Sequence, residues 1–385
     1  MNGQKTLKIK DESSEKLVRE IVEGKDINSI RMSKLLSLSD LSRTENSPIK
    51  FVVDRILNMP EFKDFDLIET PEIVPVDVSF DLFDFAADHP ARKSTDTYFA
   101  DENSILRPHT TVMWYYYLME EQIKERIKNN ESVGSLSFGK VYRKDEIDRN
   151  HFPAFHQIDG WYLCPKEEKI ITEEDLKNIL IKIAQAIFGS DVKYRFNEDT
   201  FPYTDPSLEM EIEKDGKWLE VLGSGVVRGS VLEKLGVDSS KYNGWAFGFG
   251  IERLAMLKMN IPDIRIFWSQ DKRIASQFKN LDSQYEEVSK FPMSYRDISF
   301  VVDKEVNLNR FYEIVRDHDE KDLIEEVKKT DEYENADKFG NGKVSCTFRI
   351  IYRSCEKTLT NEEVNKIQEK IISALEQDKQ WQVRK

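Results

Sequence analysis

Hydrophobic and polar residues alternate through the middle of the chain in a pattern that predicts antiparallel β-sheet. Leu208, Met210 and Ile212 are separated by glutamates, and an Asp-Gly pair at 215–216 precedes a second apolar stretch over 218–222. Alternation of this kind buries one face of a hairpin and leaves the other polar, and Asp-Gly is a favoured hairpin turn. We therefore predict a half-buried hairpin here.

Other segments follow helical or extended patterns. A short amphipathic helix is predicted over 49–58, and prolines interrupt an extended apolar stretch over 64–76, as in an edge or interface strand. A long helix is predicted over 112–128. A second pair of strands is predicted around 138–163, and the glycine-rich run at 245–250 leads into another helix.

The C-terminal part has its own order of elements. The pattern predicts strand 297–303, helix 308–317, strand 322–332, strand 343–353, helix 361–377 and a short strand near Trp381. Thr360 and Glu363 form a capping box before the second helix. This β-α-β-β-α-β order is that of the ferredoxin-like split βαβ unit, a fold that by itself indicates no function.

These patterns predict an α+β protein with two domains and two short appendages. Residues 1–46 are polar and only weakly periodic, so we expect an N-terminal arm or surface helix. The main domain is expected over 47–280, a linker over 281–289 and the ferredoxin-like domain over 290–385. A chain of 385 residues is long enough for such a division.

Composition narrows the classes of protein that remain. The chain has 57 basic and 71 acidic residues and a formal net charge of −14, which argues against a broadly basic nucleic-acid-binding surface. Residues 290–385 carry 18 basic and 20 acidic residues, so the excess acidity lies mainly in the rest of the chain. The sequence contains no long apolar run typical of a membrane span, and we expect no membrane partner.

The cysteines and the N-terminus bear on location. Cys164, Cys346 and Cys355 are scattered, so they predict neither a disulfide framework nor a zinc site. The first thirty residues are rich in Asp and Glu, unlike a mitochondrial transit peptide. We therefore expect a cytoplasmic protein, with the mitochondrial matrix as the alternative.

One predicted hairpin has the residues to bind a nucleotide. Arg143 ends a strand, a charged loop with Asp145 and His151 follows, and Phe155 and Asp159 lie on the returning strand. A strand-held guanidinium can grip an α-phosphate, a loop histidine can reach the outer phosphates, and a phenylalanine ring can cover a purine. Taken alone, such a charged hairpin is more often an ordinary surface feature.

A glycine-rich strand supports the same interpretation. Gly248 and Gly250 remove side chains from one strand face, so that a ligand can lie against the backbone. Arg253, in the first turn of the next helix, can reach a phosphate or stack on adenine. The spacing is neither that of a Rossmann fingerprint nor that of a Walker loop.

Together these segments resemble the signature motifs of the class II aminoacyl-tRNA synthetases. Motif 2 is matched by Arg143, His151, Phe155 and Asp159, motif 3 by Gly248, Gly250, Glu252 and Arg253, and motif 1 more weakly by Phe65, Ile68 and Pro71. Further segments resemble the phenylalanyl-tRNA synthetases: Asp88-His89-Pro90-Ala91-Arg92, Leu106-Arg107-Pro108-His109-Thr110-Thr111, Phe155-His156-Gln157-Ile158-Asp159-Gly160, Phe201-Pro202-Tyr203-Thr204-Asp205-Pro206-Ser207 and residues 261–273. The resemblance runs from about residue 60 to the end and fits the monomeric, mitochondrial-type architecture.

The resemblance implies an antiparallel-sheet catalytic domain, followed by an anticodon-binding domain. It implies a ligase that forms phenylalanyl-adenylate from L-phenylalanine and ATP. The enzyme then transfers the phenylalanyl group to the 2′-OH of the terminal ribose of tRNA(Phe). Carried over, the catalytic residues are Arg143, His151 and Arg253; the ATP-binding residues are Arg143, Asp145, His151, Phe155, Glu220, Gly250 and Arg253; and the phenylalanine-binding residues are His109, Thr111, Gln157, Asp159, Phe201, Tyr203, Ala246 and Gly248. Mg²⁺ is the implied metal, with Glu220 as its candidate ligand or else simply an exposed strand carboxylate. Arg349 and Arg353 are expected to bind tRNA.

The sequence departs from the family pattern at four positions of the amino-acid site. Thr111 replaces a serine and Asp159 a glutamate, both of which keep the chemistry. Trp114 stands where a glutamine is common, and Tyr203 replaces the second phenylalanine. A tyrosine hydroxyl facing the substrate ring would favour a polar amino acid.

Three other interpretations remain open at this point. One is a class II-like enzyme that activates a carboxylate for another acceptor, although paralogues of that kind usually lack the C-terminal domain. Another is a related class II synthetase with a different amino-acid specificity, such as one for O-phosphoserine, although Phe201, Tyr203 and Ala246 offer no cation for a phosphate. The third is a non-catalytic RNA-binding or regulatory protein, against which Arg143 and Arg253 argue.

Overall fold

The chain divides into two compact units. The computed structural model describes residues 5–287, 291–319, 321–354 and 356–384. The first unit comprises residues 1–143, 154–261 and 275–285, and the second comprises 144–153, 262–274 and 286–385. Two short segments expected in the main domain, 144–153 and 262–274, therefore group with the C-terminal residues.

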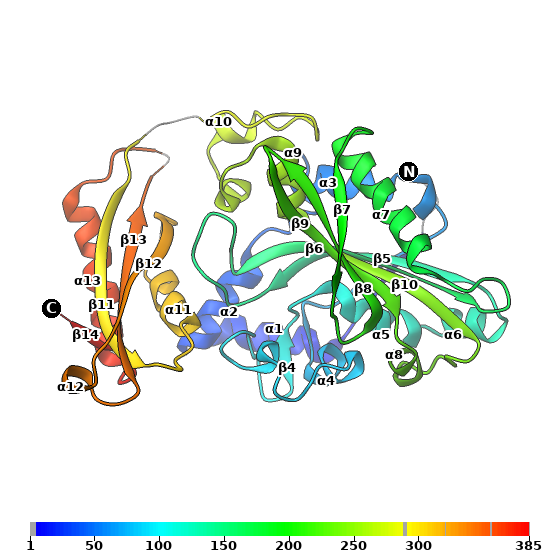
Figure 1. Ribbon diagram of the computed structural model, residues 1–385, viewed down its shortest axis with the longest axis horizontal. Helices are drawn as coiled ribbons and strands as arrows, with labels where there is room; N and C mark the ends of the chain where they lie inside the picture. Colours follow the sequence, from blue (N-terminus) through cyan, green and yellow to red (C-terminus); the bar gives the residue numbers. More distant parts are fainter. Residues whose placement is uncertain (1–4, 288–290, 320, 355, 385) are drawn as a thin grey trace. The chain divides into compact units, whose positions relative to one another are not determined.

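The first unit is built on one large sheet with strand order β1-β2-β5-β6-β10-β9-β8-β7 (Figure 1). Its strands are β1 (Thr6–Lys8), β2 (Asp66–Glu69), β5 (Val133–Tyr142), β6 (Ala154–Pro165), β7 (Tyr194–Asp199), β8 (Thr204–Lys214), β9 (Lys217–Val227) and β10 (Tyr242–Gly250). The pairs β1–β2 and β2–β5 are parallel, and the remaining neighbours are antiparallel. A separate two-stranded ladder joins β3 (Ile73–Pro75) to β4 (Ser104–Leu106).

The predicted hairpin is β8–β9, and its turn has the expected chemistry. Asp215 and Gly216 both have positive φ, 52° and 75°, as a two-residue turn between twisted strands requires. Leu208, Met210 and Ile212 are buried, and the alternating glutamates are more exposed. The sequence pattern therefore placed the turn and the buried face of β8, whereas Trp218 and Leu219 of the second apolar stretch are exposed.

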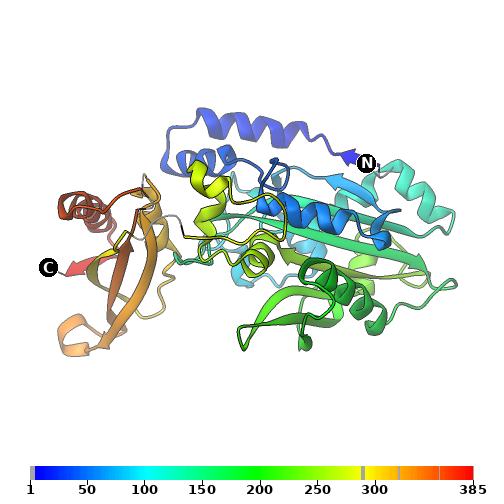
Figure 2. The same cartoon turned by 90° about the horizontal axis from the view of Figure 1, so that it is seen from above.

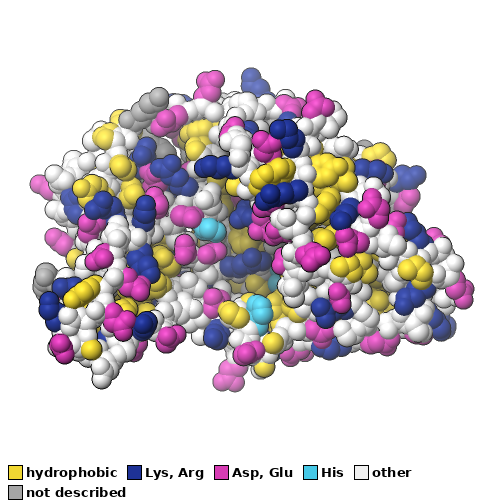
Figure 3. Space-filling model, viewed as in Figure 1, with side chains coloured by type: hydrophobic (Ala, Val, Ile, Leu, Met, Phe, Trp, Pro, Cys, Tyr) yellow, Lys and Arg dark blue, Asp and Glu magenta, His cyan; other side chains and the backbone are white. Residues whose placement is uncertain are grey.

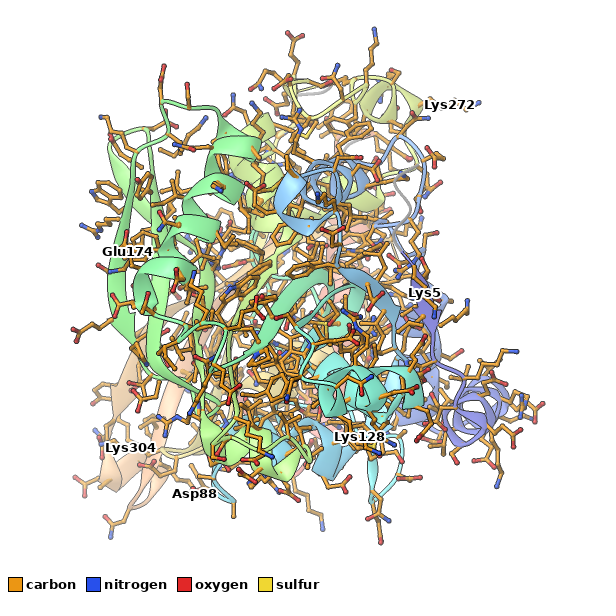
Figure 4. All side chains as sticks on the ribbon, turned by 90° about the vertical axis from the view of Figure 1, so that its right-hand side faces the viewer. Lys5, Asp88, Lys128, Glu174, Lys272 and Lys304 are labelled. Carbon is orange, nitrogen blue, oxygen red and sulfur yellow. The ribbon has the colours of Figure 1, made fainter. Side chains whose placement is uncertain are left out.

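Helices surround this sheet (Figure 2). They are α1 (Glu12–Glu23), α2 (Ile27–Ser37), α3 (Pro48–Leu57), α4 (Val76–Ser79), α5 (Met113–Met119), α6 (Glu121–Lys128), α7 (Glu173–Phe188), α8 (Gly229–Lys234) and α9 (Ile251–Met259). Lys128, at the end of α6, and Glu174, in the first turn of α7, point outward (Figure 4), as expected for amphipathic helices packed on a sheet.

The single helix predicted over 112–128 is two helices. Glu120 adopts an extended conformation (φ −67°, ψ 123°) and separates α5 from α6, and a 3-10 turn at Thr110–Val112 precedes α5. Helix α5 is apolar on nearly all sides, whereas α6 buries only Ile123. The break lets one helix enter the core while the other stays on the surface.

The N-terminal residues are more integrated than an arm. β1 adds a strand to the edge of the sheet, and α1 (dark blue) runs along the outside of this unit (Figure 2). Asp11 and Asp26 accept hydrogen bonds from the first amides of α1 and α2, as N-caps do. Leu7, Ile21, Met32, Leu35 and Leu41 are buried. Surface helices were expected here, but the strand and the buried contacts were not.

The second unit contains the ferredoxin-like domain, whose order of elements is confirmed. Its sheet runs β12-β13-β11-β14, from β11 (Ser294–Asp303), β12 (Ile324–Glu334), β13 (Lys343–Tyr352) and β14 (Gln382–Arg384), with helices α11 (Asn309–Asp317) and α13 (Asn361–Gln377). The short helices α10 (Lys272–Ala275) and α12 (Ala336–Phe339) were not predicted. The alternating apolar side chains of β13 are buried in this domain's core. Along the described residues of both units, no helix is long and apolar enough to span a membrane.

The capping box of α13 gives a first prediction. The Thr360 hydroxyl accepts from the Glu363 amide, and the Glu363 carboxylate accepts from the Thr360 amide at 3.0 Å. We expect Thr360→Ala to destabilise this helix by about 1 kcal/mol, because the Glu363 amide at the helix start loses its partner. Hydrogen exchange of the first-turn amides of α13 should accelerate accordingly, while exchange in α7, which keeps its own Thr172 cap, should stay unchanged.

Candidate active site

Three adjacent strands of the first unit carry most of the predicted site. In the ladder between β6 and β10, Asp159 pairs with Gly248 and Gln157 pairs with Gly250. Because side chains alternate along a strand, Phe155, Gln157 and Asp159 share one face of β6. The resemblance and the structure therefore bring the nucleotide-facing and amino-acid-facing candidates of motifs 2 and 3 together.

Asp159 is a buried carboxylate held by two hydroxyls. The Thr110 and Thr111 hydroxyls donate to its two oxygens at 2.6 and 2.7 Å. Burial raises the pKa of Asp159 to about 6, against the lowering effect of these hydrogen bonds and of Arg143. A Cβ atom at Gly248 would lie 2.8 Å from its Oδ1. The site thus keeps an anionic group in a low-dielectric setting, where an ammonium group would be its natural partner.

Two neighbouring polar side chains have buried atoms without a well-formed hydrogen bond. Among the described residues, neither ring nitrogen of His109 nor Oε1 of Gln157 has a partner of good geometry. Burial, together with the charge of Arg143, lowers the pKa of His109 to about 3, so the ring is neutral. Buried polar atoms are almost always satisfied in native proteins, so these atoms point to a polar ligand.

Aromatic rings form one wall of this region. Phe201 and Tyr203 stack with ring centroids 5.9 Å apart, and a Cβ at Gly223 would lie 2.6 Å from the Phe201 ring. Phe83 and Phe85, which the sequence analysis did not select, each lie 6.0 Å from Tyr203. Burial raises the pKa of Tyr203, and the charge of Asp159 adds to that effect.

Ala246, a predicted lining residue, and Trp114 both lie beside Trp161. Ala246 is buried on β10 opposite Trp161. Trp114 is also buried and stacks on Trp161 at 4.9 Å, so it fills the space where the family pattern has an amide. Its indole nitrogen has no hydrogen-bond partner in the described part of the chain. The substitution at position 114 therefore exchanges a hydrogen-bonding group for aromatic packing.

Arg143, the last residue of this segment of the first unit, is fixed beside Phe155. Its Nε donates to the Pro108 carbonyl at 2.8 Å, and its guanidinium carbon lies 5.2 Å from the centroid of the Phe155 ring. A guanidinium held by its Nε keeps its terminal nitrogens oriented together, which suits bidentate binding of a phosphate or carboxylate. Its charge also acts on both His109 and Asp159.

Arg253 and Glu220 lie together at the junction of β9 and α9. The Arg253 guanidinium donates to the Glu220 carbonyl at 3.0 Å and lies 3.9 Å from its carboxylate. Burial raises the pKa of Glu220, although Arg253 opposes the shift. No atom lies within 4 Å of a Cβ built at Gly250. Among the described residues, no group of three His, Cys, Asp or Glu side chains is arranged to hold a metal ion.

The remaining candidates, one catalytic, one for ATP and two for tRNA, belong to the second unit. His151 Nδ1 lies 2.8 Å from Asp148 Oδ1, and Asp145 accepts from the Glu146 amide. Arg349 pairs with Asp297 through two hydrogen bonds and lies 4.2 Å from the centroid of the Tyr295 ring. Arg353 follows β13 rather than lying on its open face, 2.6 Å from the buried Glu325.

Several residues around the site received no role from the sequence. Thr110 lay inside a recognised segment, and the 3-10 turn aims both threonine hydroxyls at Asp159. His156, Glu252 and Asp40 form a buried network behind the site. His156 lay inside a motif already recognised, so strand alternation could have marked its inward-facing side chain as a group needing partners.

Comparison with known proteins decides the family. A family model described as "tRNA synthetases class II core domain (F)" matches residues 35–278, and one described as "Ferredoxin-fold anticodon binding domain" matches residues 289–384. The chloroplastic/mitochondrial phenylalanine–tRNA ligase of Arabidopsis thaliana is 40% identical over 309 residues, covering 78% of this chain and 68% of its own. The chain belongs to the phenylalanine–tRNA ligase family.

Two further relatives extend this result. The mitochondrial phenylalanine–tRNA ligase of Dictyostelium discoideum is 34% identical over 372 residues, covering 82% of this chain and 78% of its own. That of Saccharomyces cerevisiae is 31% identical over 428 residues and covers 89% of both chains. The two family models confirm the predicted fold class, and the relatives confirm the family. All three relatives are named as organellar enzymes, so the comparisons do not support the cytoplasmic expectation.

Proposed function

We propose that this chain activates L-phenylalanine with ATP and transfers it to the 2′-OH of the terminal ribose of tRNA(Phe). One observation carries the choice of substrate: a buried carboxylate, Asp159, lies near the stacked rings of Phe201 and Tyr203. The carboxylate suits the α-ammonium group, and the rings suit an aromatic side chain. The buried, unpartnered atoms of His109 and Gln157 are suited to the polar part of the same ligand.

In the first step, the phenylalanine carboxylate attacks the α-phosphorus of ATP and pyrophosphate departs. Arg143 would hold the α-phosphate and stabilise the charge that develops there, and Phe155 would cover the adenine. We assign Arg253, His151 and Asp145 to the ATP phosphates, with Gly250 leaving room for the nucleotide. Thr111, Ala246 and Gly248 complete the amino-acid site.

Magnesium fits Glu220 as a single protein carboxylate, because Mg²⁺ commonly takes one or two carboxylates and otherwise phosphates and water. The half-exposed side chain of Glu220 allows this arrangement. A bound ion would supply charge neutralisation for the phosphates.

The C-terminal domain would bind tRNA. Arg349 and the exposed Tyr295 beside it offer a cation and a stacking surface, which RNA-binding proteins use for unpaired bases. On the face shown in Figure 3, basic and acidic side chains are mixed and form no continuous basic area. We therefore propose a small tRNA footprint, including Arg349 and Arg353, with affinity that falls as salt rises. We further propose a monomer that acts in mitochondria, as the names of its relatives suggest.

ATP–pyrophosphate exchange with each of the twenty amino acids tests the substrate assignment. Phenylalanine should support exchange with the highest kcat/KM, and purified tRNA(Phe) should then accept it. Preference for a polar aromatic amino acid would place the Tyr203 hydroxyl against the substrate ring and overturn the assignment. Absence of exchange, with intact folding, would favour a non-catalytic RNA-binding protein.

Gly248 and Gly250 permit a paired prediction. A methyl group at position 248 would press on Asp159, whereas one at position 250 enters open space in the free protein. We expect Gly248→Ala to raise KM for phenylalanine by about 10- to 100-fold, because small displacements of positioned groups are costly. Gly250→Ala should instead raise KM for ATP. Equal effects of both variants on both substrates would contradict these assignments.

A further inference from the structure

His156 lies at the centre of a buried polar network behind the proposed nucleotide site. It stands between Phe155 and Gln157 on β6, so its side chain points to the opposite face of the strand. Its backbone amide donates to both oxygens of Glu252 at 2.9 and 2.8 Å, and its Nδ1 lies 2.6 Å from Glu252 Oε1. Both side chains are almost completely buried.

Glu252 belongs to the first turn of α9, immediately before Arg253. Its carboxylate therefore ties the start of this helix to β6 through three hydrogen bonds from one residue. We expect a change in these hydrogen bonds to displace two neighbouring residues, Phe155 on β6 and Arg253 on α9. Both are proposed contacts of ATP.

The third partner comes from the N-terminal segment 36–43. The Leu41 backbone nitrogen lies 2.9 Å from His156 Nε2, and Asp40 Oδ1 lies 3.4 Å from the same ring nitrogen. Ser42 and Arg43 in turn bind the Asp40 carboxylate. Both ring nitrogens therefore have close neighbours: Glu252 of α9 at Nδ1, and the 36–43 segment at Nε2.

Further contacts fix the 36–43 segment across β5. Lys140 donates to the carbonyls of Leu36 and Leu38 at 2.9 and 2.7 Å, and Arg43 donates to the Phe138 carbonyl at 3.1 Å. The Arg43 guanidinium carbon also lies 4.4 Å from the centroid of the Phe138 ring. This segment is therefore a built part of the catalytic unit, although a synthetase motif does not include it.

The positive and negative side chains of the network compensate one another. Burial lowers the pKa of His156, but the charge of Glu252 and the hydrogen bond with Asp40 raise it to about 9 overall. Burial also acts to raise the pKa of Asp40, yet His156 and Arg43 hold it well below its usual range. Removing one member would leave the other charges buried without compensation.

We propose that His156 is a positioning residue that, with Glu252 and the 36–43 segment, sets Phe155 and Arg253 for nucleotide binding. This inference rests on the ATP roles proposed above for those two residues. Although Gln157 also adjoins His156, the main effect should fall on nucleotide binding, because Thr110 and Thr111 hold Asp159 independently of the network. His156 itself touches no substrate in this arrangement.

The test uses the full chain with four variants in ATP–pyrophosphate exchange. His156→Ala removes both ring contacts, and His156→Asn restores only a donor at the position of Nδ1. Asp40→Ala loosens the 36–43 segment at a partly exposed position. Asp54→Ala is the matched control, since Asp54 forms an ion pair with Lys50 of the same helix, α3. KM for ATP, KM for phenylalanine and kcat are measured, together with thermal unfolding.

His156→Ala should raise KM for ATP by about tenfold or more and leave KM for phenylalanine within about twofold, because misplaced binding groups act on their own ligand. His156→Asn should recover part of the loss, Asp40→Ala should raise KM for ATP to a lesser extent, and Asp54→Ala should match the unaltered chain. Unchanged KM for ATP in both His156→Ala and Asp40→Ala would overturn the proposal.

Equal rises in both KM values would assign the network a general structural role and would also overturn it. If His156→Ala does not fold, the Asp40→Ala result decides alone. Failure of the unaltered chain to support exchange with any amino acid would instead reject the proposed function, so the two failures are distinguishable.

Discussion

Arg143→Ala is expected to abolish phenylalanine-dependent pyrophosphate exchange while leaving the fold intact. The loss should be about 10²- to 10³-fold or more in kcat, the range seen when one preorganised electrostatic contact to a transition state is removed. Arg143 is suited to this role because its Nε donates to the Pro108 carbonyl, which fixes the direction of its guanidinium beside Phe155. Its side chain is only partly buried, so its removal leaves no large cavity.

Two further variants sharpen this experiment. Arg143→Lys keeps a positive charge but cannot both bind the Pro108 carbonyl and present a planar fork, so it should recover only a small part of the activity. Arg195→Ala removes a more exposed arginine from β7, where it pairs with Glu211 and stacks on Trp218, and should leave exchange unchanged. Near-normal exchange in Arg143→Ala would remove Arg143 from the proposed mechanism.

Asp159→Asn should produce the second large effect, and in opposite directions for activity and stability. Activity should fall because the α-ammonium group of phenylalanine loses its buried counter-charge. We expect kcat/KM to fall by about 10²-fold or more, because an ionic hydrogen bond contributes about 3 kcal/mol. The asparagine Oδ1 can still accept from one threonine hydroxyl, and its side-chain amide can donate to the oxygen of the other. The free protein should therefore remain folded.

Stability should rise at neutral pH in the same variant. The pKa of Asp159 is raised from 3.8 to about 6, so the folded protein binds a proton more tightly than the unfolded chain does. The stabilisation from that proton is complete at low pH and is lost as pH rises through about 6. At pH 7 the buried carboxylate thus lowers the free energy of unfolding by about 2–3 kcal/mol, a loss that asparagine avoids. Each kcal/mol corresponds to about 2–4 °C in Tm.

The measurements are kinetics and thermal unfolding of both proteins between pH 5 and pH 8. The difference in Tm should grow as pH rises through the pKa of about 6, and in the unaltered protein kcat/KM for phenylalanine should fall as pH drops through it. A variant that is less stable than the unaltered protein at pH 7 would show that the threonine hydrogen bonds outweigh the cost of burying the charge.

The sequence was most informative where a local rule acts alone. The β8–β9 hairpin follows from alternation and an Asp-Gly turn, and α13 follows from its capping box, because both signals involve residues that are neighbours along the chain. The motif segments located Arg143, Asp159 and Gly248, which the β6–β10 register and the position of Arg143 beside Phe155 bring together. These features needed no knowledge of distant contacts.

Long-range packing explains what the sequence did not reveal. A three-residue strand such as β1 has too short a pattern to recognise, and its pairing with β2 is decided by residues about 60 positions away. The break at Glu120 depends on how α5 enters the core, which periodicity alone cannot show. The partners of His156 come from positions 40, 41 and 252, so no local spacing could have identified them.

The pairing of β1 with β2 has a practical consequence for how this protein is handled. β2 would otherwise be an outer strand, and open strands present rows of unpaired amides and carbonyls that invite other chains to pair. Shortening the N-terminus past residue 9, or attaching a bulky tag directly against Thr6, would uncover that strand in the first unit. By covering the edge of β2, the few residues of β1 protect the protein against aggregation, and expression clones should retain them.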